Sequence, residues 1–412
     1  MRDSTIRAVN RLTSRWVETA VDGAGSTVLT AAGVWPLLAQ LADGAGGPAR
    51  GELAGALGIP PERAAAAALE LLDALGRVRG LDAATGLWAH QDLPLDPEWS
   101  ARLPEGTRGT LSGDPEKDRA ALDAWAAEHT GGRIDRMPGE VDASTLLVLA
   151  SAFALRLRWI RPFKAGSGDA SQGPWAGREF LCLRRSTSLL DRVRVADTAG
   201  GRVTVLEVVG DGGVDVHLVL GEPGAAPGGL LSGGVDVVTR AVASVDGYAL
   251  PDGAPGPGLA VGARRSYSRE PRLDVATAAF EVEGDHDLLE RARLFGLEAA
   301  SDSSSGHFPG ISAVPLAVHR GRQSAMARFH AEGFEASAVT AFYAAAGCAA
   351  TLPPYVIRRI GVTLDRPFGF LAVHRTSRLV LAAGWVAEPL PYVHQEPDED
   401  DDWDEDWDDQ HR

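Results

Sequence analysis

The stretch Phe329-His330-Ala331-Glu332-Gly333-Phe334-Glu335-Ala336-Ser337-Ala338 opens the segment that decides the fold of this chain. The segment closes with Asp365-Arg366-Pro367-Phe368-Gly369-Phe370-Leu371 and then with residues 379–389. Both ends have the apolar pattern of strands, whereas about two dozen residues between them show no helical or strand period. Connections longer than roughly 12–15 residues are uncommon and usually functional. We therefore expect an exposed loop that a protease would accept as an extended substrate.

This arrangement resembles the serpin family of suicide-substrate protease inhibitors. The hinge of that family has the form Glu-Gly-Thr-Glu-Ala-Ala, and its counterpart here is Glu332-Gly333-Phe334-Glu335-Ala336-Ser337, followed by Ala338 and Val339. The next strand of the family starts Asp-Arg-Pro-Phe, as residues 365–368 do, and residues 384–389 are similar to its Gly-x-Val-x-x-Pro ending. The alternative is a chance Gly- and Ala-rich surface loop between two strands.

Further motifs extend the resemblance to about residues 5–390. Leu122-Asp123-Ala124-Trp125 with Thr130-Gly131-Gly132-Arg133-Ile134 is similar to a serpin helix ending, and residues 145–163 to the long central strand with its Trp-x-x-Pro-Phe exit. The resemblance implies an α+β, serpin-like single domain with a large central mixed β-sheet, additional β-sheets, about eight to nine helices and an exposed reactive loop.

Composition agrees with one large domain. With 412 residues and 45% hydrophobic content, the chain can bury a sizeable core. The Pro- and Gly-rich stretch 251–262 has strand-like segments on both sides, so we interpret it as a surface loop. We expect a serpin-like domain over residues 1–391 and an acidic, disordered tail over residues 392–412.

The tail holds eleven acidic residues between Glu396 and Asp409, and such a run cannot bury enough apolar surface to fold. Removing residues 396–412, which carry these eleven and Arg412, changes the formal charge from −16 to −6. A mildly acidic body disfavours nucleic-acid binding, which needs a basic face. The tail is interpreted as a solubility tail or as a docking arm for a basic partner, anchored by Trp403 and Trp407.

Other features bear on location. The chain has two cysteines, Cys182 and Cys348, fewer than a disulfide-stapled fold would carry. Its first twenty residues have the apolar spacing of an amphipathic helix rather than of a secretion signal, and no apolar run reaches the roughly 18 residues of a membrane span. We expect a cytoplasmic monomer without membrane contact, with an extracellular location as the alternative by family analogy. Two lysines against 38 arginines point to a GC-rich bacterial genome.

Motifs for catalysis are lacking. The sequence contains no His-Glu-x-x-His, no paired Cys-x-x-Cys and no Gly-x-Ser-x-Gly. Ser303-Ser304-Ser305-Gly306-His307 brings a serine near a histidine, but such polar clusters are typical of loops. We expect no enzyme activity, no cofactor and no metal site.

Local patterns predict helices over residues 61–78, 118–129 and 287–295. They predict strands over residues 87–89, 203–209, 214–220 and 277–282. Gly210-Asp211-Gly212-Gly213 lies between two of these strands and is a strong hairpin signal.

The resemblance also implies a mechanism. In serpins, a serine protease cleaves the loop as an acyl-enzyme, and the N-terminal half of the loop inserts into the central sheet. Fifteen residues from Gly333, the scissile bond would be Gly347–Cys348, within a range of 344–351. The small residues there suit an elastase-like or subtilisin-like protease with a small primary pocket. Cys348 is interpreted as a neutral small residue, or as a thiol that oxidises or contacts a cysteine protease.

Some residues depart from the family. Phe334 replaces Thr or Ser at the first inward position, and Phe342 is bulky again; a Phe forced into a packed site costs about 1–3 kcal/mol unless a cavity awaits it. The sheet-opening region keeps Trp159, while the family's buried Ser, Ser, Asn and His are replaced by Thr30, Gly33, Ser151 and Gln323. A serpin-fold binding or scaffold protein that does not inhibit is therefore the alternative.

Overall fold

The computed structural model describes residues 2–103, 107–132, 136–137, 141–143, 145–171, 173–302, 304–318, 321–334 and 353–394. These residues contain eight α-helices and four β-sheets, in agreement with the expected α+β fold. The helices are α1 Asp3–Ala20, α2 Ala31–Gly44, α3 Gly47–Leu57, α4 Ala64–Gly76, α5 Pro97–Ala101, α6 Pro115–His129, α7 Pro227–Val238 and α8 Ala292–Phe295.

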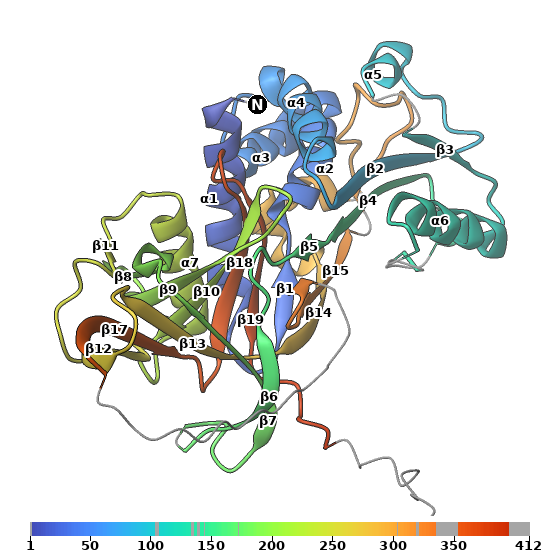
Figure 1. Cartoon of the computed structure of the whole chain (residues 1–412). Helices are drawn as coiled ribbons and strands as arrows, with labels where there is room; N and C mark the ends of the chain where they lie inside the picture. Colours follow the sequence, from blue (N-terminus) through green and yellow to red (C-terminus); the bar gives the residue numbers. More distant parts are fainter. Residues whose placement is uncertain are drawn as a thin grey trace, which may run out of the picture.

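A seven-stranded antiparallel sheet forms the centre of the core. Its order is β1-β19-β18-β10-β9-β8-β11, and helices α1 and α7 pack against it (Figure 1). Strands β10 and β19 are buried over their whole length because both faces are covered. The bounds are β1 Thr27–Leu29, β8 Val193–Thr198, β9 Gly201–Val209, β10 Val214–Gly221, β11 Val245–Asp246, β18 Phe368–His374 and β19 Val380–Val386.

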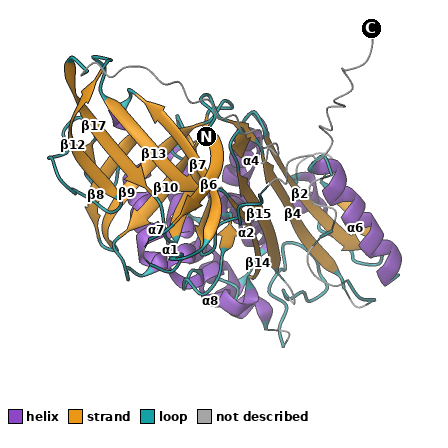
Figure 2. Ribbon diagram, turned by 60° about the horizontal axis from the view of Figure 1, so that its bottom comes forward, coloured by secondary structure: helices purple, strands orange, loops and turns teal. Residues whose placement is uncertain are grey.

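A five-stranded sheet packs beside it in the order β12-β17-β13-β7-β6 (Figure 2). Strands β13 and β17 are parallel, and the other neighbours are antiparallel. The bounds are β6 Lys164–Asp169, β7 Glu179–Thr187, β12 Leu259–Ser266, β13 Arg272–Ala278 and β17 Tyr355–Thr363.

The remaining strands form two smaller groups that lie side by side (Figures 1 and 2). One is β3-β2-β4, in which β2 and β3 are parallel, and the other is β14-β15-β16-β5. Strands β4 and β15 contact each other, yet no ladder among the described residues joins them. The bounds are β2 Leu81–His90, β3 Arg108–Leu111, β4 Leu147–Leu155, β5 Leu157–Arg158, β14 Phe280–Asp287, β15 Arg322–Phe329 and β16 Gly333–Phe334.

The local predictions had mixed outcomes. The helix over residues 118–129 and the hairpin between β9 and β10 are confirmed. The helix over residues 287–295 is wrong at its start, because β14 continues to Asp287; a 3-10 turn over Leu289–Arg291 then leads into α8. The segment without a predicted period contains β17, whose alternation is broken by the adjacent Arg358 and Arg359. In the folded protein, Arg358 Nε donates to the Gly247 carbonyl and Arg359 Nε donates to Asp274. A local sequence pattern does not reveal these contacts.

A charged network is buried inside the seven-stranded sheet. Asp215 is 1% exposed and accepts hydrogen bonds from Arg375 Nη2 and Nε at 2.6 and 2.8 Å. His217 lies two residues along β10 and is also buried. Burial lowers the pKa of His217 from 6.5 to about 4; Arg378 and two further arginines help to lower it, and Asp215 opposes them. His217 is therefore neutral in the folded protein at neutral pH.

This shift predicts a pH dependence of stability. Between pH 6.5 and pH 4 the unfolded histidine binds a proton and the folded one does not, so His217 makes stability fall as the pH falls. The complete shift corresponds to about 3 kcal/mol. Urea unfolding of the wild type and of His217→Leu at pH 7 and pH 4.5 should show a smaller acid loss in the variant. His394→Leu, at an exposed histidine, is the control, and an equal acid loss in all three proteins would contradict the expectation.

Candidate functional site at the hinge and the sheet-opening region

The first hinge residues already form a strand of the sheet. β16 is antiparallel to both of its neighbours: Phe334 pairs with Phe329 of β15 and with Leu157 of β5, and Gly333 pairs with Arg158. The chain turns back directly after β15, where the His330 N–H donates to the Gly333 carbonyl at 2.9 Å. The hinge motif was visible in the sequence, but its position between two strands is a property of the folded protein.

Phe334 lies in the core. Its side chain is 3% exposed, and its ring centroid is 6.3 Å from that of Phe370. Residues directly opposite each other in antiparallel strands point to the same face, and both partners of Phe334 are buried as well. The bulky residue that we expected to be costly thus occupies a place within an aromatic cluster, in which Phe280 stacks on Phe329 at 5.2 Å.

Trp159 donates two hydrogen bonds to the chain that precedes β16. Its backbone N–H donates to the Glu332 carbonyl at 3.0 Å, and its indole Nε1 donates to the His330 carbonyl at 2.9 Å. Its ring lies 4.8 Å from that of Phe329, and its backbone forms a bridge with Gly210 of the seven-stranded sheet's hairpin. Trp159 thereby links the hinge to two sheets.

The other predicted sheet-opening residues meet in a separate buried cluster. Gln323 of β15 accepts from the Thr30 N–H through Oε1 at 2.9 Å and donates to the Thr30 carbonyl through Nε2 at 2.8 Å. Thr30 Oγ1 also accepts from the Gly33 N–H at 3.2 Å, capping α2. A Cβ at Gly33 would lie 3.6 Å from Ser151 Oγ and 3.7 Å from Gln323 Nε2. The cluster therefore joins α2, β4 and β15.

Sequence reasoning missed His286, which borders this cluster. It lies opposite Gln323 in β14, and its Nε2 is 3.0 Å from the Val28 carbonyl and 3.2 Å from Thr27 Oγ1. Burial is the main cause that lowers the pKa of His286, so the ring is neutral near pH 7. A single histidine in a strand has no motif, and only the pairing of β14 with β15 brings it to the cluster.

Several predicted residues lie outside the described residues. These are Glu335, Ala336, Ser337, Ala338 and Val339 of the hinge, and Gly347 and Cys348 of the reactive bond. Their assignments remain predictions. The same holds for the domain boundary at residue 391, since the described chain ends at His394.

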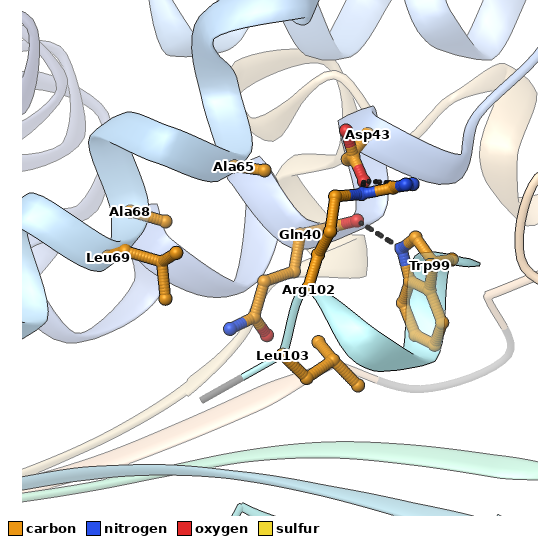
Figure 3. A pocket seen from close by; sticks show the side chains of 8 residues that line it. All are labelled: Gln40, Asp43, Ala65, Ala68, Leu69, Trp99, Arg102 and Leu103. Carbon is orange, nitrogen blue, oxygen red and sulfur yellow. Dashed lines mark hydrogen bonds and ion pairs between the residues drawn. The ribbon is translucent and has the colours of Figure 1, made fainter. Parts of the chain in front are cut away.

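A small pocket lies elsewhere, between α2, α4 and α5 (Figure 3). About 250 Å³ of space lies between its lining residues, open solvent included, so the enclosed volume is smaller than the roughly 300–1,000 Å³ that is usual for ligand sites. The indole of Trp99 donates to the Gln40 carbonyl at 3.3 Å, and Arg102 Nη2 lies 2.8 Å from Asp43 Oδ2. None of its lining residues belongs to the hinge or to the polar cluster.

The described residues contain no group of three or more His, Cys, Asp or Glu side chains placed to hold a metal ion. None of the helices they form is long and apolar enough to cross a lipid bilayer.

Comparisons with known proteins agree with this geometry. The family model described as Serpin (serine protease inhibitor) matches residues 8–171. Serpin-Z6C of Oryza sativa subsp. japonica is 26% identical over 405 residues, which cover 89% of this chain and 91% of that protein. The thermophilic serpin tengpin in its native state has a similar structure, with a TM-score of 0.72 at 13% identity, covering 94% of this chain and 95% of that one. Thyroxine-binding globulin in complex with thyroxine reaches 0.68 at 15%, covering 94% and 99%.

The polar cluster yields a prediction for Gln323→Leu. The substitution removes the acceptor of the buried Thr30 N–H, and an unpaired buried group costs about 1–3 kcal/mol. The Thr30 carbonyl loses its shortest bond but still accepts from the Gly33 and Val34 N–H groups at 3.3 and 3.4 Å. The urea midpoint of unfolding should therefore fall clearly. Gln91→Leu is the matched control, because Gln91 is exposed and donates one bond of 3.3 Å to the Ser112 carbonyl. Equal midpoints for the two variants would show that the contacts of Gln323 do not stabilise the sheet.

Proposed function

We propose that this chain, a member of the serpin family, inhibits serine-type endopeptidases by cleavage of its loop and insertion of the loop into the sheet. The observation that carries the proposal is β16. Gly333 and Phe334 already pair with β15 on one side and with β5 on the other. The loop therefore enters the sheet at the point where insertion would begin.

A path for further insertion lies directly ahead of β16. Because β16 is antiparallel to both neighbours, a longer β16 would extend into the space between β4 and β15. These two strands contact each other without a ladder among the described residues. An inserted strand would give the backbone groups at both edges hydrogen-bond partners, which is the usual gain from strand addition.

The sequence of the loop is largely compatible with this path. Side chains alternate between the two faces of a strand, so residues 336, 338, 340 and 342 would follow Phe334 on the core side. Three of these are small, namely Ala336, Ala338 and Thr340. Phe334 is already buried, so its size does not oppose the start of insertion. Phe342 is then the remaining bulky residue that must pass into the core.

The chemistry would be supplied by the protease. Its serine would attack the carbonyl carbon of Gly347, the amine of Cys348 would leave, and an ester would join the loop to the enzyme. Insertion must carry the bound enzyme away before water hydrolyses this ester. The chain itself needs no catalytic group, and the small residues at the bond favour an elastase-like or subtilisin-like protease.

A second candidate is a serpin-fold binding protein that does not inhibit. Phe342 favours it, because a bulky residue at a core-side position would slow insertion of the loop beyond β16. Thyroxine-binding globulin has a similar fold and is described in complex with thyroxine, so binding on this fold is a realistic alternative.

The test is to mix the purified chain with subtilisin and with elastase. For an inhibitor we expect a complex of summed mass on denaturing gels, and a cleaved form that melts at a higher temperature than the intact one. Sequencing the released C-terminal fragment should give a start within residues 344–351. Clean cleavage without a complex and without a rise in melting temperature would favour the binding protein.

A variant pair tests the role of Phe342. Phe342→Thr should raise the fraction of encounters that end in a complex, because an overpacked Phe costs about 1–3 kcal/mol and would slow insertion by roughly 5- to 150-fold. Phe342→Trp should lower this fraction. If both variants give the wild-type fraction on quantified gels, the side chain at position 342 does not enter the core.

A further inference from the structure

The outer face of the five-stranded sheet carries a band of positive charge. Its members come from all five strands, and we call them the basic band: Arg264 of β12, Arg359 of β17, Arg272 of β13, Arg184 of β7 and Lys164 of β6. Four of them are exposed, and Arg359 is partly buried.

Strand register places the members on one face. Arg272 lies opposite Arg359, and Lys164 lies opposite Arg184. Arg264 is two residues from Gly262, the partner of Arg359, and positions two apart share a face. The alternate residues Ile360, Leu273 and Val275 are buried, so the face of the basic band is the outer one.

The charge of the basic band is poorly compensated. Asp274 lies between Arg272 and Arg359 and accepts from their Nε atoms at 2.6 and 2.5 Å, so one carboxylate serves two guanidiniums. Among the described residues, no ion pair involves Arg264, Arg184 or Lys164. The concentration of cations contrasts with a chain whose formal net charge is −16.

The chain leaves the body at the start of β7, a strand of the same sheet. The Leu181 N–H of β7 donates to the Leu390 carbonyl at 2.8 Å, and His394 Nε2 lies 2.8 Å from Glu179 Oε2 at the start of β7. Five residues further along β7 is Arg184, at roughly 3.3 Å per residue. Residues 395–412 follow His394, and eighteen residues can span up to about 60 Å.

We propose that the acidic segment 395–412 docks on the basic band of its own chain. The segment carries eleven carboxylates and starts about 16 Å from the nearest member of the band, so its tether keeps its effective concentration in the millimolar range. The contacts lie at the surface, and salt should therefore weaken them. Tryptophans 403 and 407 of the segment can add cation–π contacts with arginine. The docked segment would lie beside β17, the strand that follows the proposed reactive loop.

The lysine content of the chain provides a sharp test on the intact protein. A water-soluble carbodiimide couples carboxylates to amines that touch them, and the only lysines are Lys164 in the basic band and Lys117 in α6. Mass spectrometry of the monomer fraction at low salt should find segment 395–412 linked to Lys164 about tenfold more than to Lys117. A cross-link from Lys117 to Asp114, whose carboxylate is 2.9 Å away, is the internal control that Lys117 reacts. Cross-links to Lys164 should disappear at about 1 M salt.

Charge reversal provides the matched comparison. Arg184→Glu with Arg264→Glu should reduce the Lys164 cross-links severalfold, whereas Arg7→Glu with Arg11→Glu, an equal charge change on α1 at exposed positions, should not. Equal linkage to both lysines in the wild type would overturn the proposal. So would linkage found only in the dimer fraction, which would mean docking on a second copy, or equal loss in both double variants.

Discussion

The hinge depends on the way Trp159 holds the chain segment that precedes it. Two hydrogen bonds from this residue, one from its backbone and one from its indole, end on the carbonyls of Glu332 and His330. They fix the turn after β15, so that Gly333 and Phe334 re-enter the sheet at once. The same indole packs on Phe329, and its backbone reaches Gly210. Any opening of the sheet at this end must therefore disturb a junction between two sheets.

The hinge and the buried polar cluster are held by two different kinds of contact. Near the hinge the contacts are aromatic and non-directional, and Phe334 joins them without an unsatisfied polar group. At the cluster of Thr30, Gly33, Ser151 and Gln323 they are directional, and loss of the Gln323 side chain would leave the buried Thr30 N–H without its partner. The strands β4 and β15 pass between these regions without a described ladder.

Electrostatics acts on a different surface. The chain has a formal net charge of −16, and eleven of its 56 acidic residues lie between Glu396 and Asp409. On the five-stranded sheet, the described part of the chain gives Arg264, Arg184 and Lys164 no ion pair. In the core, by contrast, charge is paired or absent. The buried Asp215 accepts two hydrogen bonds from Arg375, and the nearby His217 stays neutral because burial lowers its pKa.

The amino-acid sequence alone indicated the resemblance to serpins, the α+β class and the hinge motif. These are local signals: a strand start at residues 365–368, a hairpin turn at 210–213, and a run of small residues in the loop. The burial of Phe334, the position of His286 beside the polar cluster and the shared face of the five cations became visible in the folded protein. Each of these depends on which strands become neighbours and in what register, since pairing partners such as Phe329 and Leu157 are remote in the chain. Local patterns carry no information about such partners, so register and burial had to come from the fold.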